Sequence, residues 1–206
     1  REEKIAVSLT PHHKTAPENV LNVIEVMSIW VSPDGKRAAV SLKQTDQDSG
    51  KPDTWLEILE TSSGNRVFSS RNFAKIDHFN WLRDSSTFSF TVTQQDKTSI
   101  HQYNLNSLSQ EVLLKDLKNF SDYWWAPDNS YLVYCTSQKE SSTDDYKYIR
   151  DIPDRAGDSG SRYSMFICFF RGGTGNTAGT VHQVSDEEQN FQSARISPDS
   201  KTILFT

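Results

Sequence analysis

The sequence of 206 residues has little of several features that would mark a particular class of protein. It contains only two cysteines, Cys135 and Cys168, too few for a disulfide framework or a zinc site, so each is expected to be a small buried side chain on a strand. No apolar run approaches the roughly 20 residues of a membrane-spanning helix, and the longest, 165–170, is far too short. Basic residues are not in excess: the net charge is −5, so neither nucleic acid nor an anionic membrane surface is expected as a partner.

What the sequence does contain is an internal repeat. The content of 35% hydrophobic and 24% charged residues is typical of an ordinary folded domain. Within it, a short apolar segment, a polar turn with an aspartate and an alternating strand recur four times. The copies are IWVSPDGKRAAVSL (29–42), FNWLRDSSTFSFTV (79–92), YWWAPDNSYLVYCT (123–136) and ARISPDSKTILFT (194–206).

Each copy is typical of a β-hairpin. In the first, Pro33 presets φ for a turn, Asp34 can hydrogen-bond its own backbone and Gly35 tolerates positive φ. In the second, Phe88 and Phe90 alternate with polar residues, as in a strand with one buried face. Further strand and turn signals complete four antiparallel strands in about 45 residues, which is the signature of a β-propeller blade.

The sequence therefore predicts an all-β fold, a partial β-propeller of about three and a half four-stranded blades. The expected blades are 29–70, 71–117, 118–188 and 189–206, the last of which has two strands within the sequence and opens a further blade of a larger propeller. Residues 138–162, polar and rich in glycine and aspartate, are expected as an insertion between the second and third strands of the third blade. Residues 1–28 form a lead-in segment with a short helix over 17–27, because Val20, Val23, Ile24 and Met27 have helical spacing.

Three motifs suggest chemistry, and a structural interpretation is favoured for each. The segment GGTGNTAG (172–179) resembles a flavin-phosphate loop, but the residues after it are β-branched and non-helical, so a hairpin is favoured and no cofactor is expected. The segment GDSGS (157–161) resembles the nucleophile surround of chymotrypsin-like proteases, but it lies within the polar insertion. The five histidines lack metal-ligand spacing, so no catalytic residue and no metal ligand is assigned. His101 lies on a predicted strand and is not a credible base without a partner.

Two groups of residues remain as structural or binding candidates. Tryptophans recur at matching positions of the blades, and packing between neighbouring blades is expected for them: Trp30, Trp81, Trp124 and Trp125. Insertions on a repeat scaffold project from one face, where binding sites commonly arise. The candidate binding residues in the insertion are therefore Arg150, Asp151, Asp154 and Arg155, against the alternative of a solvated surface loop.

The repeated SPDG, APDN and SPDS hairpins resemble those of TolB-type proteins and of the N-terminal propeller of the prolyl oligopeptidase family, which includes dipeptidyl-peptidases and acylaminoacyl-peptidases. The opening ENVLNVIEVMSIWVSPDGKRAAVSL and the insertion YIRDIPDRAGDSGSRYSMFIC are similar to peptidase segments. This resemblance implies a propeller that caps a C-terminal α/β-hydrolase domain of the same polypeptide and admits short peptides to a serine triad. None of the triad residues has a match in these 206 residues.

The resemblance leaves a second class of function open, that of a TolB-like scaffold which is not an enzyme and which binds a protein partner or forms a homo-oligomer. It also leaves the compartment open, with a periplasmic or secreted location favoured over a cytoplasmic one.

Overall fold

The computed structural model describes residues 23–46, 50–71, 75–138, 162–170, 178–185, 191 and 193–206. Every regular element among these residues is a β-strand, so none of them forms a helix of the length and apolarity that a membrane crossing needs. The strands are β1 (Glu25–Val31), β2 (Arg37–Thr45), β3 (Pro52–Glu60), β4 (Arg66–Ser69), β5 (Asp77–Trp81), β6 (Thr87–Gln94), β7 (Lys97–Asn104), β8 (Ser109–Lys118), β9 (Phe120–Trp125), β10 (Tyr131–Gln138), β11 (Arg162–Phe170), β12 (Ala178–Gln183), β13 (Ala194–Ile196) and β14 (Ile203–Phe205).

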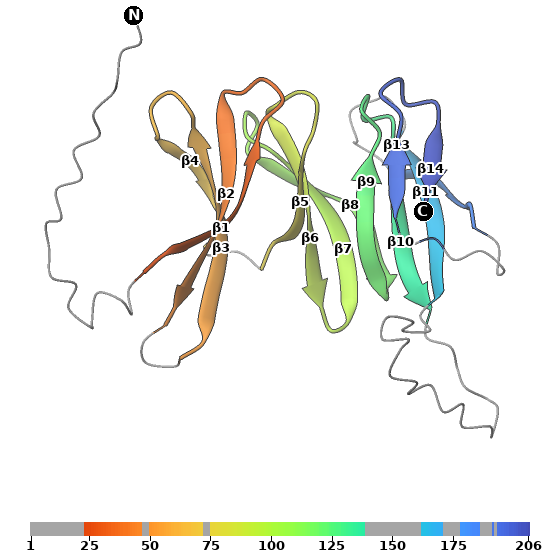
Figure 1. Cartoon of the computed structure of the whole chain (residues 1–206), viewed down its shortest axis with the longest axis horizontal. Coiled ribbons are helices and arrows are strands. Elements are labelled where there is room, and N and C mark those ends of the chain that lie inside the picture. The colour runs from red at the N-terminus through yellow and green to blue at the C-terminus, as the bar shows by residue number, and fades with distance from the viewer. Residues whose placement is uncertain are drawn as a thin grey trace, which may run out of the picture.

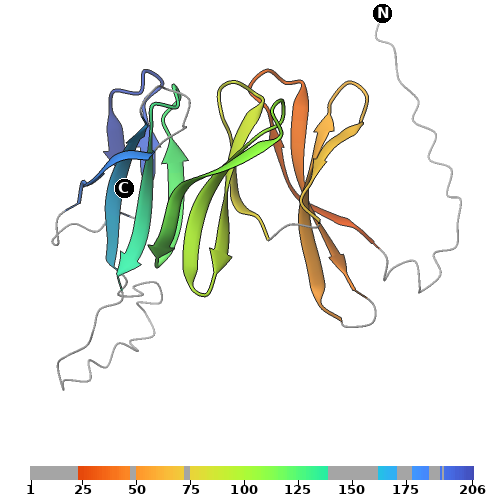
Figure 2. The ribbon, with the colours of Figure 1, turned by 180° about the vertical axis from the view of Figure 1, so that it is seen from behind.

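The strands form three four-stranded sheets and one two-stranded sheet, all antiparallel and each paired in the order of the sequence. The sheets stand side by side along the molecule, and the pair β13–β14 lies beside the third sheet (Figures 1 and 2). This is the predicted all-β arrangement of three and a half blades, which is therefore confirmed. Residues 139–161, which lie outside the described residues, connect β10 to β11, the second and third strands of their sheet.

The lead-in helix is wrong for its last residues. Strand β1 begins at Glu25, so Val26 and Met27 are extended, and Val26 pairs with Leu42 of β2. The rest of the expected helix, up to residue 22, lies outside the described residues. The physical reason is pairing with a distant segment: Glu25 and Val26 are held extended against Lys43 and Leu42 of β2, with a register shift between Val26 and Ser28. Local apolar spacing does not encode this contact.

In all four sheets the same kind of turn joins the first strand to the second. In the first, the Gly35 amide donates to the Ser32 carbonyl over 2.9 Å, and the same bond closes the other three turns at 2.8–3.1 Å. The fourth residue of each turn has positive φ, and these residues are Gly35, Ser85, Asn129 and Ser200. The aspartate of each turn accepts from local donors; for example, the Ser32 hydroxyl donates to Asp34 over 2.7 Å. The turn aspartates therefore have a structural role, as the repeat predicted.

The apolar cores lie between successive sheets. Phe79, Phe88 and Phe90 of the second sheet pack against Ala39 and Ile58 of the first. Separate cores join the second sheet to the third, and the third to β13–β14. Cys168 lies in the former and Cys135 in the latter; both are buried, which confirms their prediction as small buried side chains.

Candidate functional site

The four binding candidates from the sequence are not among the described residues. Arg150, Asp151, Asp154 and Arg155 all lie outside the described residues. Most of the glycine-rich segment 172–179 does so too, but β12 begins at Ala178. The residues behind the glycines therefore form a strand, where a phosphate-binding loop would need a helix N-terminus.

The described histidines have structural partners. His78 Nδ1 lies 3.1 Å from the Thr91 hydroxyl, and His101 Nδ1 lies 3.0 Å from Gln110 Nε2. The His182 ring packs edge-on against Phe169. Within the part of the chain that the structure describes, no hydrogen bond or ion pair joins a histidine to a carboxylate, and no cluster of histidine, cysteine and carboxylate side chains could hold a metal ion.

The tryptophans connect neighbouring sheets, as predicted. The indole Nε1 of Trp81 in β5 donates to the carbonyl of Trp30 in β1 over 2.9 Å, and the Trp30 ring packs against Phe79 at 5.4 Å. The equivalent Trp125 in β9 donates to the hydroxyl of Ser89 in β6 over 2.8 Å. Trp124 faces the opposite way and packs against the core shared with β13–β14.

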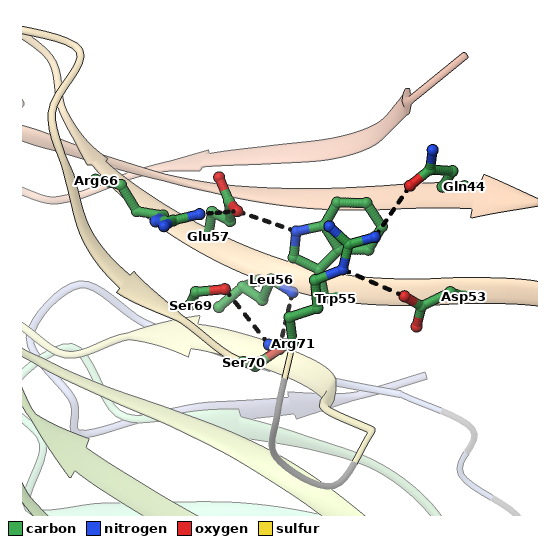
Figure 3. Close-up of polar contacts among 9 residues, drawn as sticks. All are labelled: Gln44, Asp53, Trp55, Leu56, Glu57, Arg66, Ser69, Ser70 and Arg71. Atoms are coloured by element: carbon green, nitrogen blue, oxygen red, sulfur yellow. Dashed lines mark hydrogen bonds and ion pairs between the residues drawn. The ribbon is translucent and has the colours of Figure 1, made fainter. Parts of the chain in front are cut away.

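The face of the first sheet that points away from the second carries a polar cluster, shown in Figure 3. The Arg71 guanidinium stacks over the Trp55 ring at 4.2 Å, donates to Gln44 over 3.0 Å and lies 3.5 Å from the Asp53 carboxylate. Glu57 accepts from the Trp55 indole, over 3.1 Å, and also from Arg66. Arg71 thus contributes to leaving Trp55 only 4% exposed. Because two cations face two carboxylates, the cluster is balanced without a ligand.

At the edge strand β1, the same face of the first sheet is apolar and exposed to solvent. Ile29 and Val31 of β1 are 60% and 59% exposed, whereas Phe79 and Tyr123, which stand at the position of Ile29 in the second and third repeats, are 6% and 1% exposed. The exposure of β1 differs from that of its counterparts because sheets two and three each have a preceding sheet against this face. Among the described residues, nothing comparable covers β1.

A cavity of about 310 Å³ opens between the first and second sheets. One wall is formed by Phe68 of β4 and by Ile76, and the other by side chains of β6, β7 and β8. Aromatic residues form much of the lining, and charged residues stand at one end. The residues that carry its chemistry are Phe68, Phe90, Lys97, His101, Tyr103 and Lys115. No feature of the sequence near His101 indicates this cavity, because the cavity depends on how two sheets are placed.

Comparison with known proteins places the fold. No protein-family model matches the sequence, and no curated protein matches it. Among solved structures, Pyrococcus horikoshii acylaminoacyl peptidase is similar with a TM-score of 0.56 and 14% identity, over 80% of this chain and 25% of that one. TolB from Acinetobacter baumannii has a TM-score of 0.53 and 17% identity, over 89% of this chain and 37% of that one. The β-propeller domain of the Trilobed protease from Pyrococcus furiosus has a TM-score of 0.50 and 13% identity, over 78% of this chain and 43% of that one.

The fold is that of a β-propeller. At these identities the likeness concerns the fold, and the expected relation to TolB-like propellers and to the propellers of acylaminoacyl peptidases is confirmed at that level. The chain spans a quarter of the length of the Pyrococcus horikoshii peptidase that it matches. The three sheets and the pair β13–β14 can thus be called propeller blades, numbered one to four in chain order.

Proposed function

We propose that this chain is the propeller part of a serine peptidase of the prolyl oligopeptidase family. In this role it caps a C-terminal α/β-hydrolase domain of the same polypeptide, admits short peptides and has no catalytic residue of its own. The observation that carries the proposal is the similarity of the blades to those of acylaminoacyl peptidase, with a TM-score of 0.56. The described histidines contact a side-chain hydroxyl, a side-chain amide and an aromatic ring, and these contacts support a non-catalytic role.

The proposal is tested on the complete protein and on the 206-residue chain in parallel. Both are treated with a fluorophosphonate that labels activated serines, and both are assayed with chromogenic acylaminoacyl and prolyl substrates. We expect labelling and hydrolysis by the complete protein only. A rate from the 206-residue chain that survives repurification would show that the propeller itself is catalytic, which contradicts the proposal.

Gating is tested separately with substrates of increasing size. The complete protein should hydrolyse peptides of a few residues and leave unfolded casein intact, because a propeller that covers the hydrolase domain restricts access by size. Equal rates per scissile bond on short peptides and on casein would refute gating while leaving the peptidase assignment standing.

A second candidate function has its own observation. TolB from Acinetobacter baumannii matches the largest share of this chain among the similar structures described above, 89%, at a TM-score of 0.53. This favours a scaffold without catalysis that presents its surface to a protein partner or to a second copy. Absence of serine labelling in the complete protein, together with a defined complex in size-exclusion chromatography, would support the scaffold over the peptidase.

A further inference from the structure

The cavity between blades one and two arises from the length of one strand. Strand β4 has four residues, whereas β7 and β8 in the facing blade have eight and ten. Phe68 of β4 covers one end of β7, where its ring lies 5.0 Å from the ring of Tyr103. Strand β4 ends one residue later at Ser69, so the far end of β7, which begins at Lys97, lines an open cavity instead of a packed interface.

The inner part of the cavity is lined by aromatic rings. Phe90 is 4% exposed, and the His101 imidazole lies parallel to it, with ring centroids 5.5 Å apart and an interplanar angle of 12°. Phe68 and Tyr103 add two further rings, and Val112 adds an apolar side chain that is 51% exposed. Flat apolar walls with exposed hydrocarbon favour a ligand that contains an aromatic ring.

The charged end of the cavity has an excess of positive charge. Lys97 and Lys115 line it with exposed ammonium groups, and neither is ion-paired to another described residue. One carboxylate, Asp116, lines the same end, so two cations face one anion. Unlike the balanced cluster around Arg71, this arrangement leaves one positive charge that a ligand can neutralise.

His101 contributes a neutral hydrogen-bond donor rather than a third positive charge. Burial lowers the pKa of its imidazole, which keeps the ring neutral at physiological pH. The Gln110 amide nitrogen lies 3.0 Å from Nδ1 and can only donate, so Nδ1 accepts and the ring hydrogen is on Nε2. A neutral donor suits an oxygen acceptor on the ligand.

We propose that this cavity binds a small carboxylate with one aromatic ring. The ring lies between Phe68 and Phe90, and the carboxylate points toward Lys97 and Lys115. A volume of about 310 Å³ is at the lower end of the range for small-molecule sites, which fits a ligand of one ring. The proposal goes beyond the peptidase role and does not rest on it, because it concerns only contacts between blades one and two.

The probe is 3-phenylpropanoate, titrated into the 15N-labelled 206-residue chain and followed by NMR, with the neutral 3-phenylpropanamide as the matched control ligand. A ligand of about a dozen non-hydrogen atoms should bind the chain with a Kd on the order of 0.1–1 mM. The shift changes should centre on Ile76, His101 and Val112. Raising the salt from roughly 20 to 300 mM should weaken the acid and leave the amide unchanged.

Two pairs of variants separate charge from cavity. Lys97→Gln combined with Lys115→Gln should weaken the acid roughly three- to tenfold and spare the amide. The matched control is Lys201→Gln, at an exposed lysine of the turn between β13 and β14, far from the cavity lining. Val112→Trp, which fills the cavity from an exposed position, should abolish binding of both ligands, whereas Val67→Trp on β4, also exposed but absent from the lining, should not.

Three results would overturn the proposal. One is the absence of saturable shifts up to about 10 mM acid, a limit well above the expected Kd. Another is equal affinity for acid and amide in the unsubstituted chain, which would remove the role of the lysines. The third is a centre of shift changes on the exposed apolar residues of β1, which would show non-specific binding elsewhere.

Discussion

Substitution of Tyr123 by phenylalanine should destabilise the contact between blades two and three. The Tyr123 hydroxyl donates to the His78 carbonyl over 2.8 Å and lies 2.8 Å from the Ser89 hydroxyl, which also accepts from the Trp125 indole. Tyr123 is 1% exposed and Ser89 is 0% exposed. Burial raises the pKa of the Tyr123 hydroxyl, so it stays protonated and can donate over the whole range in which the protein is studied.

The expected magnitude follows from the groups left behind. In Tyr123→Phe the His78 carbonyl loses its 2.8 Å side-chain donor and retains a longer contact of 3.5 Å from the Asn80 amide, and the Ser89 hydroxyl loses one of its two side-chain partners. Leaving buried polar groups unpaired costs about 1–3 kcal/mol. We expect a loss of about 2 kcal/mol in the free energy of unfolding, which corresponds to a fall in Tm of roughly 4–8 °C for a chain of this size.

The assay is urea unfolding followed by tryptophan fluorescence, with Tyr103→Phe as the matched control. The Tyr103 hydroxyl has no hydrogen bond to any described residue in the structure, so that control should change the free energy of unfolding by less than about 0.5 kcal/mol. A double-mutant cycle with Ser89→Ala should show coupling of about 1 kcal/mol. Equal effects of the two Tyr→Phe substitutions, or no coupling to Ser89, would refute the network as a stabilising contact.

Three further predictions follow from the turns and from β1. Ser85→Ala should cost about 1 kcal/mol, because it removes the 3.0 Å bond from the Asp34 amide; Ser85→Gly should be nearly neutral in urea unfolding, because relief of the positive φ offsets that loss. The hydrogen bond from the Ser32 hydroxyl is the main cause that lowers the pKa of Asp34. The contribution of the ionised Asp34 carboxylate to the free energy of unfolding should therefore be complete above about pH 4 and be lost as the pH falls through the lower pKa of the folded state. Asp34→Asn should reduce the change in the free energy of unfolding between about pH 5 and 3, measured by urea unfolding. Ile29→Lys with Val31→Glu should reduce self-association in analytical ultracentrifugation, since both exposed apolar side chains lie on an edge strand; unchanged association would locate the contact elsewhere.

The features that sequence alone predicted are those set by local chemistry. Pro33, Asp34 and Gly35 specify a turn within a few residues. An aspartate in a polar turn, which all four repeats share, located all four hairpins. Burial of Cys135 and Cys168 followed from their place on alternating strands. These predictions needed no knowledge of which sheet faces which.

The features that sequence missed depend on contacts between distant segments. Phe68 and His101 meet at one cavity only because two blades are placed face to face, and nothing near either residue signals this. Arg71 covers Trp55 from beyond the end of β4, a contact that no periodicity reveals. The helix over 17–27 failed at its end because Glu25 and Val26 pair with β2, a segment distant in the sequence. Arg150 and its three companions in the insertion stay a prediction.

The brevity of β4 has a consequence for how such a protein can change. As the last strand of its sheet, β4 has a neighbour on one side only, so residues could be added at its end without breaking a hydrogen-bond ladder on the other side. Each added residue would extend the wall above Lys97 by about 3.3 Å. The aperture between blades one and two can therefore be widened or closed by insertions and deletions after Arg71, which keep the hydrogen bonds between Ser70 and Leu56 and the buried core around Phe88.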